Sequence, residues 1–255
     1  MTVVNAPPDQ PDAAPSLDQL VDAVVDTYRA DGRTEHIDAT FLPSRDEAIR
    51  LIDMLRELVF PGFFGPARIT SDNVRFHVGE MIQQVRDEVA RQIDHALRYA
   101  ANLEREGHGD ACEKCTEQAR QITDDFLRQL PELRRLLALD VQAAFDGDPA
   151  CRHTDEAVFC YPGVYAIFIH RMAHTLFLAE VPLLPRLMNE HAHSRTGIDI
   201  HPGATIGESF FIDHGTGVVI GETAVIGDRV KIYQSVTVGA PAANLSQSAR
   251  GVKRH

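Results

Sequence analysis

Residues 196–239 read TGIDIHPGATIGESFFIDHGTGVVIGETAVIGDRVKIYQSVTVG, and this stretch decides the fold. Glycine recurs at multiples of six residues, at Gly197, Gly203, Gly215, Gly221, Gly227 and Gly239. Small aliphatic residues follow three positions later, at Ile200, Ile206, Ile212, Val218, Ala224, Val230 and Val236. A second aliphatic position appears later, at Ile220, Ile226, Ile232 and Val238. Because neither a helix nor a simple strand has a period of six, the repeat predicts a parallel β-helix of short strands and turns.

The repeat is interrupted at His214, which falls on the position that Ile220, Ile226 and Ile232 hold later. Asp213 precedes this histidine, and the glycine-rich sequence Gly-Thr-Gly follows it. On spacing alone, an inert histidine at a solvent-facing corner explains the break as well as a functional one does. Further polar residues fall within about one and a half coils, so we expect them to gather around one edge: Asp199, His201, Asp213, His214 and Glu222.

The chain before the repeat has the pattern of helices. Residues 1–15 contain four prolines and little that could pack, so we expect a disordered lead there. Apolar residues at helical spacing begin at Leu17, after Ser16 as an expected N-cap, and recur up to residue 180. We therefore predict an all-helical domain over residues 16–195 and a β-helix over residues 196–255.

Composition and charge exclude several functions. The chain has 255 residues and a formal net charge of −12, which argues against nucleic acid or an anionic membrane as a partner. No secretory leader or membrane-spanning apolar run is recognisable, so we expect a cytoplasmic protein with free thiols at its four cysteines.

Two sets of metal-ligand type residues lack the partners that a metal needs. Cys112 and Cys115 form an isolated CxxC pair, and His170 and His174 lie four apart on one predicted helix without an evident third ligand. We therefore expect no metal, and we interpret the two histidines as surface or packing residues.

Several short motifs, together with the repeat, resemble serine O-acetyltransferases, members of the hexapeptide-repeat acyltransferases. Before the repeat they are Asp148-Pro149-Ala150, Tyr161-Pro162-Gly163 and His170-Arg171-Met172-Ala173-His174. Within it they are Asp199-Ile200-His201-Pro202, Asp213-His214-Gly215-Thr216-Gly217, Gly221-Glu222-Thr223-Ala224 and Gln234-Ser235-Val236-Thr237. The resemblance covers most of residues 148–255. It implies an α+β fold, in which an all-α domain precedes a left-handed parallel β-helix.

The resemblance also implies a reaction. The family transfers acetyl from acetyl-CoA to the hydroxyl of L-serine, giving O-acetyl-L-serine for cysteine biosynthesis. A serine hydroxyl needs a base near neutral pH, and histidine has the suitable unperturbed pKa. His214 stands where the family places that base, and Asp199 matches the carboxylate that orients its imidazole.

Serine carries an ammonium and a carboxylate, so its site needs charges of both signs. By resemblance, Asp148 and Asp213 would contact the amino-acid substrate, and Arg254 and His255 match a pair at the substrate carboxylate. Glu222 matches an acidic residue near the site, without an assigned role. From the residues alone, an Asp-Pro turn is the favoured explanation of Asp148, and Asp213 could be a corner residue of the β-helix.

The family also implies an assembly and a longer chain. Its members form homotrimers or dimers of trimers, with the active site between neighbouring β-helices, and their C-terminal tail binds O-acetylserine sulfhydrylase. Here residues 240–255 read as the external loop that the family inserts, and the chain stops at His255. We therefore expect an incomplete β-helix, truncated before the coils that supply much of the acetyl-CoA site.

Three alternatives stay open. The chain could be a non-catalytic oligomerisation or regulatory fragment of the family, or a sugar acetyltransferase. It could also be a β-helix zinc enzyme of the carbonic-anhydrase type, which needs three converging histidines. The repeat offers only His201 and His214 for that purpose.

Overall fold

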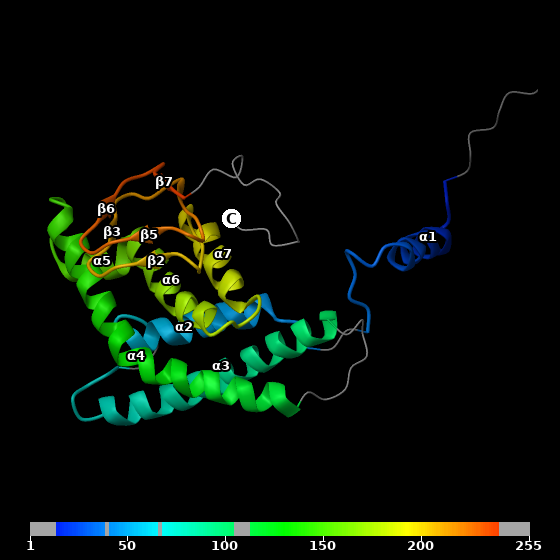
Figure 1. Ribbon diagram of the computed structural model, residues 1–255, viewed down its shortest axis with the longest axis horizontal. Coiled ribbons are helices and arrows are strands. Elements are labelled where there is room, and N and C mark those ends of the chain that lie inside the picture. Colours follow the sequence, from blue (N-terminus) through cyan, green and yellow to red (C-terminus); the bar gives the residue numbers. More distant parts are fainter. Residues whose placement is uncertain (1–13, 39–40, 66–67, 105–112, 240–255) are drawn as a thin grey trace, which may run out of the picture. The chain divides into compact units, whose positions relative to one another are not determined.

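The computed structural model describes residues 14–38, 41–65, 68–104 and 113–239 (Figure 1). The chain forms two compact units, residues 1–40 and 41–255, and the predicted boundary after residue 195 falls within the second. Arg254, His255, Cys112, the loop 240–255 and most of the expected lead lie outside the described residues.

The first unit contains α1 (Leu17–Ala30). Ser16 caps this helix as expected: its hydroxyl accepts from the Gln19 amide at 3.3 Å, and the Gln19 side chain accepts from the Ser16 amide at 2.8 Å. None of the residues of α1 is buried.

The second unit begins with six helices, which confirms the helical prediction for this part of the chain. They are α2 (Arg45–Val59), α3 (Val74–Glu104), α4 (Glu113–Gly147), α5 (Thr154–Cys160), α6 (Pro162–Leu178) and α7 (Leu184–Thr196). Their apolar faces share one core, in which Leu51, Ile93, Phe126, Phe168 and Met172 are buried. None of the described helices has the length and apolarity required to cross a membrane.

Seven short strands follow the helices (Figure 1). They are β1 (Ile198–Ile200), β2 (Thr205–Ile206), β3 (Phe211–Ile212), β4 (Val218–Ile220), β5 (Val225–Ile226), β6 (Lys231–Ile232) and β7 (Thr237–Val238). Each of the first four strands pairs in parallel with the third strand after it, in the orders β1-β4-β7, β2-β5 and β3-β6. The chain therefore passes through three sheets in turn and returns to the first. We call this region the strand stack.

The register of the strand stack corrects one prediction. Ile200 pairs with Ile220, twenty residues on, whereas Val219 pairs with Thr237, eighteen residues on. The first circuit therefore holds two extra residues. The side chain stacked on Ile200 in the next coil, in the same column, is that of Ile220 and not that of Val218. The extra length lies in the turn between β3 and β4, where His214, Gly215 and Gly217 have φ angles of 57°, 87° and 76°. His214 thus lies in a bulged turn rather than on an aliphatic position of the repeat.

A buried ion pair joins the helices to the strand stack. The Arg171 Nε on α6 lies 2.6 Å from Oδ2 of Asp140 on α4, and the two side chains are 5% and 0% exposed. Arg171 also donates to the carbonyl oxygen of Gly207 at 2.8 Å, and the Phe210 amide donates to Asp140 at 2.9 Å. Burial raises the pKa of Asp140, and its hydrogen bond with Arg171 opposes that rise. The pair therefore fixes α4 and α6 against the first circuit.

The cysteines differ from one another. Cys151 is free and buried, and Cys160 is free and exposed. Cys115 is disulfide-bonded. The expectation of four free thiols is therefore wrong for Cys115.

Candidate active site

His214 lies on the bulged turn with its imidazole open to solvent. Its side chain is 76% exposed, and its Nε2 lies 3.9 Å from Oδ1 of Asp213. The turn packs closely on β1: a Cβ at Gly215 would lie 2.5 Å from Cδ1 of Ile198. Only glycine combines that approach with a φ of 87°. The backbone therefore presents a freely accessible imidazole from a fixed turn.

Asp213 is held more firmly than its neighbour. Its side chain is 15% exposed, and its amide donates to the carbonyl oxygen of Ile232 at 2.9 Å. Its Oδ2 lies 3.0 Å from Nζ of Lys231 on β6. Sequence reasoning missed Lys231, because its nearness to Asp213 follows from the twenty-residue register and not from the six-residue repeat.

Asp148 follows the last residue of α4. Its Oδ2 accepts from the Tyr161 hydroxyl at 2.5 Å, and its Oδ1 accepts from the Ala150 amide at 2.8 Å, as in an Asp-Pro turn. The Tyr161 bond first, and then the Ala150 bond, lower the pKa of Asp148, with smaller contributions from the charges of Lys231 and His214. The structure thus places an ionised carboxylate within electrostatic range of His214.

Tyr161 keeps its proton beside this carboxylate. Burial, and then the hydrogen bond to Asp148, raise the pKa of Tyr161. Its ring stacks on Phe211 of β3, with centroids 6.3 Å apart and planes at 24°. The start of α6 therefore positions a neutral hydroxyl that orients Asp148.

Asp199 lies on β1 in a different environment. Its carboxylate approaches Glu190 and His193 of α7, with one ligand atom of each within 4.8 Å of the others. In the described ranges, no hydrogen bond or ion pair joins Asp199 to His214. The orienting contact predicted for Asp199 is therefore not formed within one chain.

Glu222 and the other histidines have neighbours of their own. Glu222 lies just after β4 and close to Gly203. A Cβ added to Gly203 would lie 2.8 Å from Cγ of Glu222 and 3.0 Å from the Phe177 ring. His201 packs edge-on against the same ring, with centroids 5.7 Å apart. His170 and His174 stack with centroids 5.5 Å apart. Among the described residues, one triad has ligand atoms within 4.8 Å of one another, Glu190, His193 and Asp199, and it contains a single histidine.

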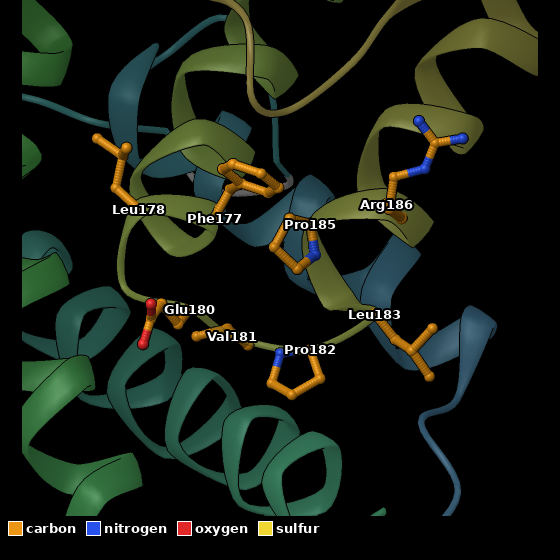
Figure 2. Close-up of a pocket in the computed structure, with 8 residues that line it drawn as sticks. All are labelled: Phe177, Leu178, Glu180, Val181, Pro182, Leu183, Pro185 and Arg186. Atoms are coloured by element: carbon orange, nitrogen blue, oxygen red, sulfur yellow. The ribbon is translucent and has the colours of Figure 1, made fainter. Parts of the chain in front are cut away.

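A hollow of about 510 Å³ lies at the connection between α6 and α7. Figure 2 shows its lining, in which Glu180 and Arg186 are the charged side chains among apolar ones. No predicted site residue lines it. The candidate active site is therefore the open edge formed by the bulged turn, the end of α4 and Lys231.

Comparisons with known proteins agree with this architecture. A serine acetyltransferase of Synechococcus elongatus, designated "plasmid", is 44% identical over 218 residues, which cover 84% of this chain and 68% of that protein. The serine acetyltransferases of Synechocystis and Bacillus subtilis are 54% and 50% identical, over 40% and 41% of this chain and 41% and 48% of their own length. The chain thus matches less than half the length of these two. No family model matches.

Solved structures give the same result. Serine acetyltransferase 1 of Entamoeba histolytica in its native form has a TM-score of 0.65 and 30% identity, over 94% of this chain and 82% of that one. The same enzyme in complex with L-cysteine has a TM-score of 0.64 and 37% identity, over 80% and 69%. A helical region followed by a six-residue strand repeat, with these relatives, places the chain among the hexapeptide-repeat acyltransferases. This chain belongs to the serine acetyltransferase family.

Proposed function

We propose that this protein is a serine O-acetyltransferase, which transfers acetyl from acetyl-CoA to the hydroxyl of L-serine and releases CoA and O-acetyl-L-serine for cysteine biosynthesis. The observation that carries the proposal is the grouping of two carboxylates, Asp148 and Asp213, beside the open imidazole of His214. Two carboxylates next to one lysine suit a substrate ammonium, and an accessible imidazole suits a base. The Entamoeba relative binds L-cysteine, which has the same ammonium and carboxylate as serine.

In this proposal His214 is the general base. It accepts the proton of the serine hydroxyl as the oxygen attacks the thioester carbon. The carbon–sulfur bond then breaks, and the proton passes to the CoA sulfur. Base assistance of this kind contributes about 10²–10⁴ in rate. Asp148 and Asp213 position the amino acid, which supplies a further part of the rate enhancement.

We assign Asp199 to orient the imidazole. Because Asp199 does not contact His214 within one chain, this role requires a different rotamer of the exposed His214 side chain or a neighbouring chain. Arg254 and His255 are proposed at the substrate carboxylate, and Glu222 near the site.

The test is thiol release from acetyl-CoA with L-serine, compared with no acceptor and with a sugar acceptor. Serine-dependent release is expected, and release with the sugar alone would contradict the proposed substrate. His214→Ala should lower turnover at least about a hundredfold, because the general base is lost. A matched control is His153→Ala, which removes an exposed histidine at the start of α5 and should leave turnover unchanged. Near-normal turnover in His214→Ala would remove the assignment of the base.

The finer features of the family are proposed as well. We infer that the strand stack is left-handed and that chains assemble as a homotrimer or a dimer of trimers, with sites between neighbouring stacks. O-acetylserine sulfhydrylase as a partner and a cytoplasmic location belong to the same proposal. Size-exclusion chromatography with light scattering tests the oligomer, since a monomeric protein would contradict it.

A further inference from the structure

Lys231 connects two parts of the candidate active site that are distant in sequence. Its Nζ donates to the carbonyl oxygen of Gly147 at 2.7 Å and lies 3.0 Å from Oδ2 of Asp213. Gly147 is the last residue of α4 and directly precedes Asp148. One ammonium therefore links the helix end that carries Asp148 to the turn that carries Asp213 and His214.

The packing around Lys231 restricts where its ammonium can go. Lys231 is the register partner of Phe211 on the adjacent strand, and its Nζ lies 5.0 Å from the Phe211 ring centroid and 4.5 Å from that of Tyr233. A Cβ on Gly147 would lie 2.7 Å from the Phe211 ring and 3.7 Å from Cδ of Lys231, so the helix end meets this lysine at close range. The side chain is 29% exposed. This environment holds the ammonium between α4 and the turn.

We propose that Lys231 is a positioning residue of the amino-acid site, which fixes the carboxylate of Asp213 and its separation from Asp148 for the ammonium of the substrate. The inference rests on the function proposed above. Lys231 engages Oδ2 of Asp213. The other carboxylate oxygen, Oδ1, lies 3.9 Å from Nε2 of His214 and remains for the substrate ammonium.

Lys231 also sets the charge around His214. The charged groups that the structure brings together here are Asp213 on the turn, Asp148 after α4 and Lys231 on β6. Their titratable neighbours include Tyr233, which contacts Lys231, and Tyr161 with Cys151 beside it. Contacts with Tyr233, and then with Asp213, raise the pKa of Lys231, so the residue stays cationic at neutral pH. Its positive charge offsets part of the negative charge that Asp148 and Asp213 bring to this edge.

Two effects of removing this charge on serine binding oppose each other. The site becomes more acidic, which attracts the substrate ammonium, but at an open, solvated edge one unit charge changes affinity only by about two- to fivefold. A misplaced charge-assisted hydrogen bond weakens binding by about ten- to a hundredfold. The loss of positioning is the larger effect, so the KM for serine should rise.

The experiment compares four proteins across pH by the acetyl-CoA thiol-release assay. Lys231→Met should raise the KM for serine about tenfold and move the acidic limb of the kcat/KM profile about 0.3 to 0.7 unit toward higher pH. Lys231→Arg should return both to within about twofold of the wild type, since it keeps the cation. Arg229→Gln removes an equal charge from a second hollow, at the end of α4, which Lys231 also lines. This control should change neither the KM nor the acidic limb.

The outcomes separate this inference from the proposed function. If the wild type is active and Lys231→Met has the same KM for serine and the same acidic limb, the positioning role is overturned and the proposed function stands. An inactive wild type would overturn the function and the inference together. If Lys231→Met loses its circular dichroism signal, Lys231→Gln replaces it, because its amide can still donate to Gly147 without charge. That variant should show the same shift of the acidic limb, and an unshifted limb would overturn the inference.

Discussion

The buried ion pair between Asp140 and Arg171 gives a stability prediction that can be worked out from the structure. Arg171→Met leaves the Asp140 carboxylate, which is 0% exposed, without its cation. It also removes the donor to the carbonyl oxygens of Ile206 and Gly207. Removing one partner of a buried pair costs about 3–5 kcal/mol, because the remaining charge stays buried without compensation. For a unit of this size, each kcal/mol lowers Tm by about 2–4 °C, so we expect a decrease of about 6–20 °C.

Urea unfolding followed by circular dichroism at 222 nm measures this loss. The control is Arg135→Gln, because Arg135 also connects α4 to the strand stack, through Glu208 at 3.2 Å, but its side chain is 50% exposed. That variant should change the free energy of unfolding by less than about 1 kcal/mol. The double variant Asp140→Leu/Arg171→Met should recover much of the loss, since no charge remains buried. Equal stability of Arg171→Met and the control would refute the reasoning.

Two further predictions concern the candidate active site. Gly215→Ala should destabilise the protein by about 1–3 kcal/mol in the same urea assay, because the added Cβ would clash with Ile198 and the residue has a positive φ. Gly227→Ala is the control, since no atom lies within 4 Å of its added Cβ. A loss no larger than the control's would contradict the close packing of the turn. Tyr161→Phe should raise the pKa of Asp148, read from its side-chain carboxyl carbon by NMR. Because folding lowers the pKa of Asp148, this carboxylate stabilises the fold above its ordinary pKa near 3.8, and that stability is lost as the pH falls below 3.8. Tyr161→Phe should make this loss of stability in acid smaller. An unchanged pKa of Asp148 in the variant would contradict the role assigned to Tyr161.

The sequence predicted the helices and the repeating strands because both depend on local periodicity. Ser16 could be recognised as an N-cap for the same reason, since the cap forms within four residues. The six-residue spacing likewise showed which aliphatic residues face inward, and Ile200, Ile206, Ile220 and Ile226 are buried.

Long-range contacts could not be read from the same pattern. Lys231 meets Gly147 across 84 positions of the chain, and Arg171 meets Asp140 across 31. Family resemblance suggested Asp148 as a site residue, but its hydrogen bond with Tyr161 depends on how α6 begins beside α4. Asp199 was expected beside His214, yet its side chain meets α7, because that helix runs directly into β1.

The bulged turn between β3 and β4 has a consequence for how such repeats are interpreted. Side chains along a strand alternate with a period of two, so an insertion of two residues restores the same facing beyond it. Val218, six residues after Ile212, therefore still points inward although it belongs to a different column. The two extra residues of this turn are consequently silent in the spacing of the aliphatic residues. The fold can thus accommodate a chemically useful loop at a corner while Ile212 and Val218 keep their six-residue spacing, and His214 marks the place in the sequence.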